Sequence, residues 1–196
     1  MAAEKGEGAG RAIDSLMPSD MSIPTLETER FIMRPLVRDD AAALFPTFSD
    51  PDQCRYLWDA AFEDVGTLAD WLCDPDWEGR SWTAVSRDSG ALVARIVAIP
   101  TSELQSEIGY TVVKEIQRGG IASECTNRLV QYLFEDEDHH RITASTDPRN
   151  IASNRVLEKL GFRREAHFLK NAKTHLGWCD EYYWALLRSE WSSQAG

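Results

Sequence analysis

The sequence predicts an α+β domain in which a mixed, mainly antiparallel β-sheet is flanked by helices. Residues 107–113 and 141–146 have the alternation and the β-branched content of strands. Each strand is followed by a turn and then by a helical repeat of apolar residues, the first beginning at Ile121 and the second after Asn150. Further strand-like runs lie on both sides of this central stretch, and such an arrangement is typical of the α+β class.

The chain is expected to form one domain. Its 196 residues, of which 43% are hydrophobic, suffice to bury a single core. We assign residues 23–191 to this domain, 1–22 to a disordered N-terminal tail, and 192–196 to a C-terminal tail. The first segment lacks the apolar centre of a signal peptide, and no apolar run approaches the roughly 18 residues needed to cross a membrane. The expected location is therefore the cytoplasm, with no membrane partner.

Charge and cysteine content narrow the function classes. The net charge of −11, from 21 basic and 32 acidic residues, argues against nucleic-acid binding, because neutralising phosphates requires clustered Lys and Arg. An acidic surface suits a cationic acceptor, although it also serves solubility alone. No C-x-x-C pair and no zinc-ligand spacing is present. We expect no metal, and reduced thiols at Cys54, Cys73, Cys125 and Cys179.

The N-terminal half of the domain begins with a strand at residues 30–36. A helix is predicted to start near Asp39 and Asp40 and to continue through Phe45 and Phe48, since negative charge suits a helix N-terminus. The chain is then expected to be irregular over residues 51–61 and helical again over residues 63–73.

Four more strands complete the predicted sheet. Residues 81–87 and 91–99 form two strands that a turn at Asp88-Ser89-Gly90 joins into a hairpin. After the central stretch, residues 163–173 and 178–187 are predicted to be two closing strands.

A glycine-containing turn, Gln117-Arg118-Gly119-Gly120-Ile121-Ala122, joins the strand at 107–113 to its helix. Two adjacent glycines allow positive φ and leave no Cβ to block a close ligand. The unpaired N–H groups of the first helical turn, with Arg118 beside them, predict an anion site suited to a diphosphate. The alternative is a tight turn with no ligand. The G-x-x-x-x-G-K-[ST] loop is absent, and G-x-G-x-x-G does not occur at this turn.

The second helix of the central stretch has signals at both ends. Asp147-Pro148 ends the strand at 141–146, and Asn150 is a suitable N-cap. Gly161 is suited to the position just after the helix.

In this order, several motifs resemble the GNAT superfamily of N-acetyltransferases, particularly the branch that acetylates the N-terminal alanine of ribosomal proteins. The resemblance covers roughly residues 23–191 and rests on Glu107-Ile108-Gly109-Tyr110, Gln117-x-x-Gly120-x-Ala122, Asn150-x-x-Ser153 and Val156-Leu157-Glu158-Lys159-Leu160-Gly161-Phe162. It implies a GNAT-like sheet in which a splayed pair of strands holds acyl-CoA, and it is compatible with a homodimer.

The resemblance also implies which residues bind acetyl-CoA. The turn would hold the diphosphate of CoA through backbone N–H groups, and the end of the preceding strand would offer backbone to the pantetheine arm. The helix after Asn150 would contact the cofactor as well. The residues implied are Val112, Val113, Gln117, Arg118, Gly119, Gly120, Ile121, Ala122, Asn150 and Ser153.

Two residues are candidates for catalysis by resemblance. Glu107 is the candidate base, with an ordinary edge-of-strand glutamate as the alternative. The superfamily often has a tyrosine that acts as the general acid at the position of Leu157. Leu157 cannot donate a proton, so Ser153 is the candidate acid, with a helix-capping serine as the alternative. The chain also differs from the superfamily pattern at Arg118-Gly119, where relatives usually have Gly followed by Lys or Arg.

Tryptophans gather in the N-terminal half. Core and lid packing is one interpretation of these residues. The other is an aromatic wall of the acceptor pocket, because the helices of this region form one side of the acceptor cleft in the resembled family. The residues concerned are Trp58, Trp71, Trp77 and Trp82.

The predicted activity is direct transfer of an acetyl group from acetyl-CoA to a primary amine. An α-amine has a pKa of about 7.7–8.0 and a lysine of about 10.4, a difference of roughly 3.5 kcal/mol in the work of deprotonation. The preferred acceptor is therefore the N-terminal α-amine of a protein or peptide. The alternatives are a small amine, such as an aminoglycoside-like antibiotic or a polyamine, and a non-catalytic acyl-CoA-binding module.

Overall fold

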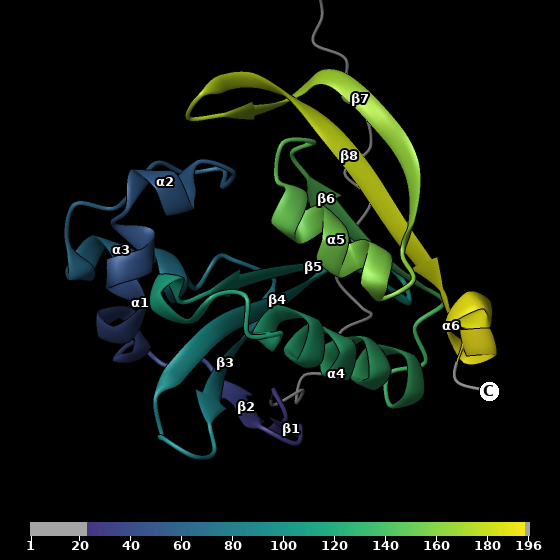
Figure 1. Ribbon diagram of the computed structural model, residues 1–196, viewed down its shortest axis with the longest axis horizontal. Helices are drawn as coiled ribbons and strands as arrows, with labels where there is room; N and C mark the ends of the chain where they lie inside the picture. Colours follow the sequence, from purple (N-terminus) through teal and green to yellow (C-terminus); the bar gives the residue numbers. More distant parts are fainter. Residues whose placement is uncertain (1–22, 195–196) are drawn as a thin grey trace, which may run out of the picture.

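The computed structural model describes residues 23–194 and has the predicted α+β fold. One eight-stranded sheet has the order β1-β2-β3-β4-β5-β6-β8-β7. Only β5 and β6 pair in parallel, and the other neighbouring strands pair antiparallel. Helices flank the sheet (Figure 1). The predicted disordered tail, residues 1–22, lies outside the described residues.

The strands are β1 (Leu26–Glu27), β2 (Phe31–Pro35), β3 (Arg80–Ser86), β4 (Leu92–Ser102), β5 (Gln105–Val112), β6 (Arg141–Thr146), β7 (Arg163–Thr174) and β8 (Gly177–Leu187). The helices are α1 (Asp40–Phe48), α2 (Pro51–Cys54), α3 (Val65–Leu72), the 3-10 turn η1 (Lys114–Ile116), α4 (Ile121–Glu135), α5 (Ile151–Lys159) and α6 (Arg188–Gln194). Over residues 23–194, none of these helices has the length and apolar content that crossing a bilayer would require.

Four elements were not predicted: β1, α2, η1 and α6. The short strand β1 adds an edge to the sheet, and α6 crosses the expected domain boundary at residue 191. The helix α2 lies in the segment predicted to be irregular, where Pro51 occupies its first turn and the Asp50 carboxylate accepts a hydrogen bond from the Asp52 N–H. This capping makes so short a helix possible without an apolar repeat in the sequence.

The parallel pair β5–β6 opens after three residue pairs. The register runs Gln105↔Arg141, Ser106↔Ile142 and Glu107↔Thr143, and beyond Glu107 the two strands separate. β5 stays paired with β4 as far as Val112, while β6 follows β8. The splayed strand pair predicted from the resemblance is therefore confirmed.

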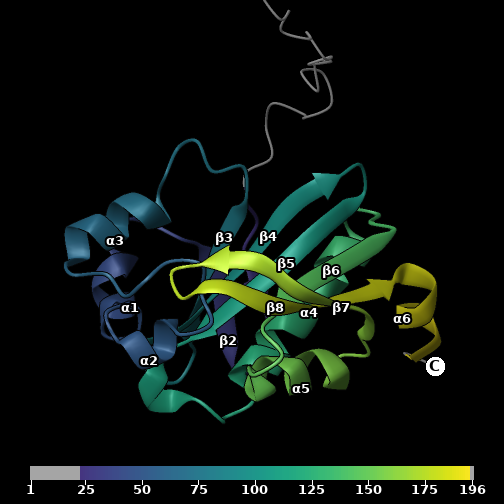
Figure 2. The same ribbon diagram turned by 90° about the horizontal axis from the view of Figure 1, so that it is seen from above.

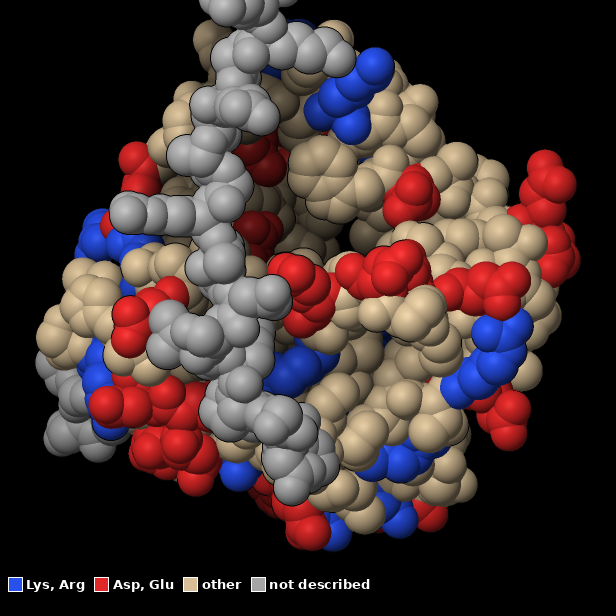
Figure 3. Space-filling view, turned by 180° about the vertical axis from the view of Figure 1, so that it is seen from behind, with Lys and Arg blue, Asp and Glu red and all other residues tan. Residues whose placement is uncertain are grey.

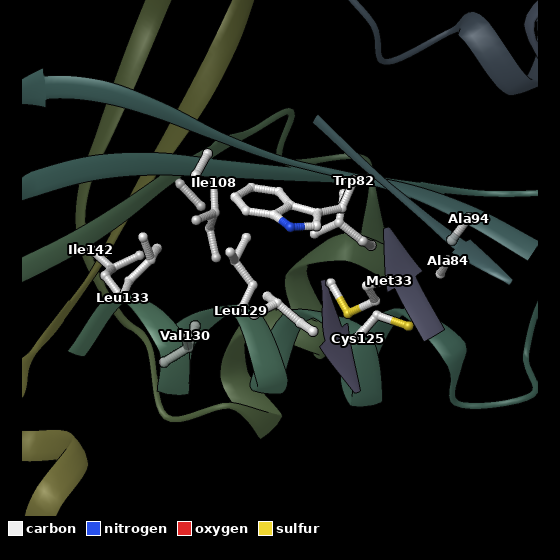
Figure 4. Packing of buried hydrophobic residues seen from close by; sticks show 14 of the residues in the cluster. Met33, Trp82, Ala84, Ala94, Ile108, Cys125, Leu129, Val130, Leu133 and Ile142 are labelled. Atoms are coloured by element: carbon white, nitrogen blue, oxygen red, sulfur yellow. The ribbon is translucent and has the colours of Figure 1, made fainter. Parts of the chain in front are cut away.

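The main core lies between the sheet and α4. The apolar face predicted for α4 is buried, with Cys125, Leu129 and Leu133 fully enclosed, and it packs on Met33 and Trp82 of the sheet (Figure 4). Burying side chains of this size stabilises the fold by about 1.5–3 kcal/mol each. Burial raises the pKa of the Cys125 thiol to about 12, which agrees with a packing role for this cysteine.

A second core joins α1 and α3. Its buried members include Leu44 and Phe48 from α1 and Leu68 and Leu72 from α3. These helices gather at one end of the molecule, away from α4 and α5 (Figures 1 and 2). The fold therefore has two separately packed cores, one around α4 and one between α1 and α3.

A buried carboxylate fixes α1 to the sheet. Asp40, only 6% exposed, accepts hydrogen bonds from Arg34 on β2 (2.6 and 2.8 Å), from the Val37 N–H (2.9 Å) and from Thr83 on β3 (2.8 Å). Burial opposes ionisation of Asp40, but the hydrogen bonds from Arg34, Val37 and Thr83 together hold its pKa below the ordinary value.

We predict that Asp40→Asn lowers the free energy of unfolding at pH 7 by about 3 kcal/mol, because it leaves Arg34 without its anionic partner. A carboxylate with a depressed pKa stabilises the fold above its unfolded pKa of about 3.9, and this stability is lost as the pH falls through its folded pKa. Chemical denaturation should therefore show the gap between variant and wild type narrowing at acid pH.

Asp39→Asn is the matched control. Asp39 is exposed and its side chain makes no capping hydrogen bond, so the free energy of unfolding should change by less than about 0.5 kcal/mol. Equal effects of the two substitutions, or an Asp40→Asn effect that does not depend on pH, would contradict the assigned role of Asp40.

Candidate active site

A cavity of about 300 Å³ lies where β5 and β6 separate. Strands β4, β5 and β6 form its floor, the segment from α1 to β3 forms one wall, and the start of α5 forms another. The β7–β8 hairpin reaches across toward α2, where the His175 N–H donates to the Trp58 carbonyl at 3.1 Å (Figures 1 and 2). The opening is thus bordered on several sides.

Glu107 lies where the opening begins, at the last residue of β5 that pairs with β6. Its side chain lines the cavity. Burial is the largest influence on this carboxyl and raises its pKa; a hydrogen bond from Ser145 partly offsets that rise, and nearby Glu181 adds to it. A carboxyl whose pKa is moved toward neutrality and that faces a cavity is suited to accept a proton.

The cavity lining also contains Asp59 and Asp147. Asp147 forms an ion pair with Arg149 at 2.6 Å, and hydrogen bonds from Arg149 hold its pKa below the ordinary value. On one face of the molecule, Asp and Glu side chains surround and enter a hollow (Figure 3). The cavity lining itself holds three acidic residues, Asp59, Glu107 and Asp147, which would attract a cation.

The turn between β5 and α4 has two residues in the left-handed region. Gly120, the N-cap of α4, has φ 76°, and Arg118 has φ 70°. Gly119 does not share this conformation, and a Cβ built on it would meet no protein atom closer than 3.6 Å. Of the two glycines, Gly120 adopts the positive φ that glycine allows, and Gly119 leaves the space beside the turn free of a Cβ.

The N-terminus of α4 has the chemistry of an anion site. No side chain caps it, so the first-turn N–H groups, beginning with those of Ile121 and Ala122, are free of that kind of partner. The dipole of this 15-residue helix places partial positive charge at the same point. These residues fit a bound diphosphate.

Arg30 reinforces this turn and was not among the predicted site residues. Its Nη1 donates to the Gly119 carbonyl at 3.0 Å, and its Nε donates to Glu124 of α4 at 2.6 Å. Its Nη2 lies 3.5 Å from the point where a Cβ of Gly120 would stand. The guanidinium therefore links the turn to the first turn of α4, which local sequence signals do not reveal because Arg30 is far away along the chain.

The predicted backbone partners of the pantetheine arm differ from each other. Val113 donates its N–H to Val93 of the neighbouring segment at 3.0 Å, so that group is used within the sheet. Neighbouring residues of a strand direct their polar backbone groups to opposite sides, so Val112 faces the open edge of β5. The Val112 carbonyl accepts from Gln117 Nε2 at 3.2 Å, and the same nitrogen donates to Gln53 at 2.6 Å. Gln117 thus ties the turn to α2.

The start of α5 lies on the other side of the opening. Asn150 caps the helix by accepting from the Ser153 N–H at 3.2 Å, and both residues line the cavity. Tyr110 reaches across from β5 and donates its hydroxyl proton to the Ser153 carbonyl at 3.0 Å. Leu157, at the position where the superfamily often has a tyrosine, is fully buried and lines the same cavity.

The four tryptophans divide between the two interpretations given to them. Trp82 is fully buried in the main core and donates from its indole to the Pro24 carbonyl at 2.8 Å. Trp58, Trp71 and Trp77 line the cavity. Core packing is thus correct for Trp82, and the other three form an aromatic wall.

Arg95 is a further cavity residue that the sequence analysis missed. It lies on β4, lines the cavity and is 9% exposed. The signal available was a single arginine inside the apolar run Leu92-Val93-Ala94-Arg95-Ile96-Val97-Ala98-Ile99. Within residues 23–194, no group of His, Cys, Asp and Glu side chains is arranged to hold a metal ion.

Comparison with known proteins assigns this arrangement to a family. A model described as an acetyltransferase (GNAT) domain matches residues 30–163. The N-acetyltransferase YnaD of Bacillus subtilis is 31% identical over 168 residues, which cover 85% of this chain and 99% of that protein. The [ribosomal protein uS5]-alanine N-acetyltransferase of Escherichia coli is 29% identical over 89 residues, 43% of this chain and 44% of the enzyme.

Solved structures have the same fold. An acetyltransferase of the GNAT family from Bacillus anthracis superposes with a TM-score of 0.79 at 29% identity, covering 85% of this chain and 100% of that one. A spermidine N-acetyltransferase from Vibrio cholerae, in complex with CoA and spermine, superposes with a TM-score of 0.74 at 18% identity, covering 84% and 99% of the two chains. The resemblance drawn from the motifs is confirmed, and the chain belongs to the GNAT family of acetyl-CoA-dependent N-acetyltransferases.

Proposed function

We propose that this enzyme acetylates the N-terminal α-amine of a protein or peptide. The observation that carries the proposal is the position of Glu107, a carboxyl with a raised pKa at the point where the cofactor strand opens into an acidic, aromatic cavity. The partial match to a ribosomal-protein-alanine N-acetyltransferase supports this acceptor. Membership of an enzyme family argues against the non-catalytic acyl-CoA-binding alternative.

The cofactor would be held along the open edge of β5. The N–H groups at the start of α4 bind the diphosphate, with Arg30 and Gly120 fixing the shape of the turn. Val112 offers its backbone to the pantetheine arm, and Asn150 and Ser153 approach from α5. When bound, acetyl-CoA supplies an activated thioester carbonyl near the apex of the opening.

Proton transfer is assigned to Glu107. An α-amine with a pKa of about 7.7–8.0 is already partly neutral at pH 7, so a carboxylate of raised pKa is a sufficient base, acting directly or through water. A lysine with a pKa of about 10.4 would require roughly 3.5 kcal/mol more for deprotonation. The carboxylates of Asp59 and Asp147 would attract the incoming ammonium group.

Ser153 remains the proposed donor to the departing thiolate. It lines the cavity at the start of α5, and Leu157 has no proton to donate. Tyr110 is a poor substitute, because its hydroxyl already donates to the Ser153 carbonyl at 3.0 Å.

A small polyamine is the second candidate acceptor. The acidic lining of the cavity favours a polycation, and the fold is shared with a spermidine N-acetyltransferase. The aromatic wall formed by Trp58, Trp71 and Trp77 would stack on either kind of cation.

An acceptor panel tests the proposal. We predict that peptides with a free α-amine are acetylated with a higher kcat/KM than the same peptides carrying a blocked N-terminus and one lysine. The panel includes spermidine and spermine, with CoA release as the rate assay and mass spectrometry to locate the acetyl group. Turnover confined to polyamines would establish the second candidate, and turnover of no amine would overturn the proposal.

We predict that Ala122→Asp raises the Kd for acetyl-CoA at least about tenfold, because it puts a like charge beside the diphosphate. A first-turn aspartate interacts favourably with the helix dipole, so the melting temperature should stay level or rise. Asn127→Asp is the matched control: it makes the same charge change at an exposed position in the middle of α4. Equal affinities of the two variants in calorimetric titration would place the diphosphate elsewhere.

We predict that Glu107→Gln lowers kcat/KM by about 100-fold and removes one ionisation from the acidic limb of its pH profile. The pKa of Glu107 is raised on folding, so its ionisation opposes folding as the pH rises, and the variant should be at least as stable as wild type at pH 8. A profile with an unchanged acid limb would rule out Glu107 as the base.

A further inference from the structure

Arg95 is a buried cation on the acceptor side of the cavity. It projects from β4 on the same face as Val97 and Ile99, which also line the cavity. Its residue surface is 9% exposed, although arginine is among the residue types least often buried without a partner. Its position therefore requires a physical explanation.

The protein provides Arg95 with little polar compensation. Its Nε donates to Ser81 Oγ at 3.0 Å, the one hydrogen bond that the guanidinium makes within residues 23–194. Its Cζ lies 4.9 Å from the ring centroid of Trp71 and 5.3 Å from that of Trp77. A guanidinium has five N–H donors, so four remain without a partner of this kind.

No carboxylate of the described chain pairs with Arg95. The cavity contains Asp59, Glu107 and Asp147, yet Asp147 is paired with Arg149 and none of the three forms an ion pair with Arg95. Burial lowers the pKa of Arg95 to about 10, so the side chain remains cationic at neutral pH. An unpaired buried charge is unfavourable for the empty protein, and a bound anion would remove that cost.

The two tryptophans make the site selective for a planar anion. They hold the guanidinium by cation–π contacts, which fix its plane without satisfying its N–H donors. A fixed, planar fork with free donors matches the two oxygens of a carboxylate. A purely structural arginine would instead be expected to have its donors used by the protein.

We propose that Arg95, in cation–π contact with Trp71 and Trp77, binds a carboxylate of the acceptor. The inference rests on the proposed function, since it supplies the second point of recognition for a substrate whose amine lies at Glu107. The acceptor is then a primary amine that carries a carboxylate at a set distance.

The sheet register gives that distance. Arg95 pairs with Thr111 and Glu107 pairs with Ile99, so the two positions are four residues apart along β4, or about 13 Å. Both residues line the cavity. An acidic side chain at the second to fourth position of an extended peptide fits this span, and so does a linear amino acid with a long chain between amine and carboxylate.

The experiment compares acceptors that differ only in one charge. One arm uses C-terminally amidated peptides with a free N-terminus and Glu or Gln at position 2, 3 or 4. The other arm uses linear ω-amino acids and their amides. For each, the Kd in the presence of CoA and the kcat/KM with acetyl-CoA are measured for wild type, Arg95→Met and Arg95→Lys.

Wild type should prefer the carboxylate member of at least one pair by about 30-fold or more in Kd, and Arg95→Met should abolish this preference. Arg95→Lys should retain part of it, because the charge remains while the bidentate geometry is lost. The arm that shows the preference identifies the source of the carboxylate, a peptide or a small amino acid.

Three outcomes would overturn the inference. Wild type could bind both members of every pair with the same Kd, Arg95→Met could raise the Kd of both members by the same factor, or no acceptor of either arm could bind. If the preference in Kd depends on Arg95 but no acetyl transfer occurs, the proposed function is wrong and the carboxylate site is still supported. Thermal unfolding separates folding from recognition, since Arg95→Met removes an unpaired buried charge and should not lower the melting temperature.

Discussion

The parallel pairing between β5 and β6 ends after the pair Glu107↔Thr143, and the rest of the site depends on this early separation. Each strand is held on its other side by an antiparallel partner, β4 for β5 and β8 for β6, so the two can part without either losing its place in the sheet. The open edge of β5 then offers backbone N–H groups that no strand satisfies. Tyr110 bridges the gap by donating its hydroxyl proton to the Ser153 carbonyl of α5.

Two ionisable side chains near this opening, Glu107 and Arg95, are buried although their charged forms are more stable in water. Burial raises the pKa of Glu107 and lowers that of Arg95, and in both cases it disfavours the charged form. Asp40, by contrast, is also buried but accepts hydrogen bonds from Arg34, the Val37 N–H and Thr83, and its pKa is lowered. The contrast separates a carboxylate that stabilises the fold from two charges that form no ion pair within residues 23–194, which is the pattern expected of a functional site.

Local signals in the sequence predicted much of this architecture. The Asn150 cap, the inward face of α4 and the positive φ of Gly120 each depend on a few neighbouring residues, and all three are present. Contacts between residues that are far apart in the sequence were not predicted. Nothing near Arg30 indicates its bond to Glu124, and spacing alone did not separate Trp82, which is enclosed by the core, from the tryptophans of the cavity. The burial of Arg95 follows from β4 having neighbours on both edges and α3 nearby.

The division into two cores explains how one fold can keep its cofactor and change its acceptor. The helix α4, whose N-terminus is suited to the diphosphate, packs in the main core, whereas α1 and α3 form a core of their own. The hydrogen bond from Gln117 to Gln53 links the segments around the two cores, and it lies at the surface, where substitution is tolerated. Substitutions among α1, α2 and α3 can therefore reshape the acceptor wall while the turn at Gly120 stays as it is. In this chain that wall contains Trp71 and Trp77 facing Arg95, so selectivity among amines is expected to reside there and not in the cofactor half.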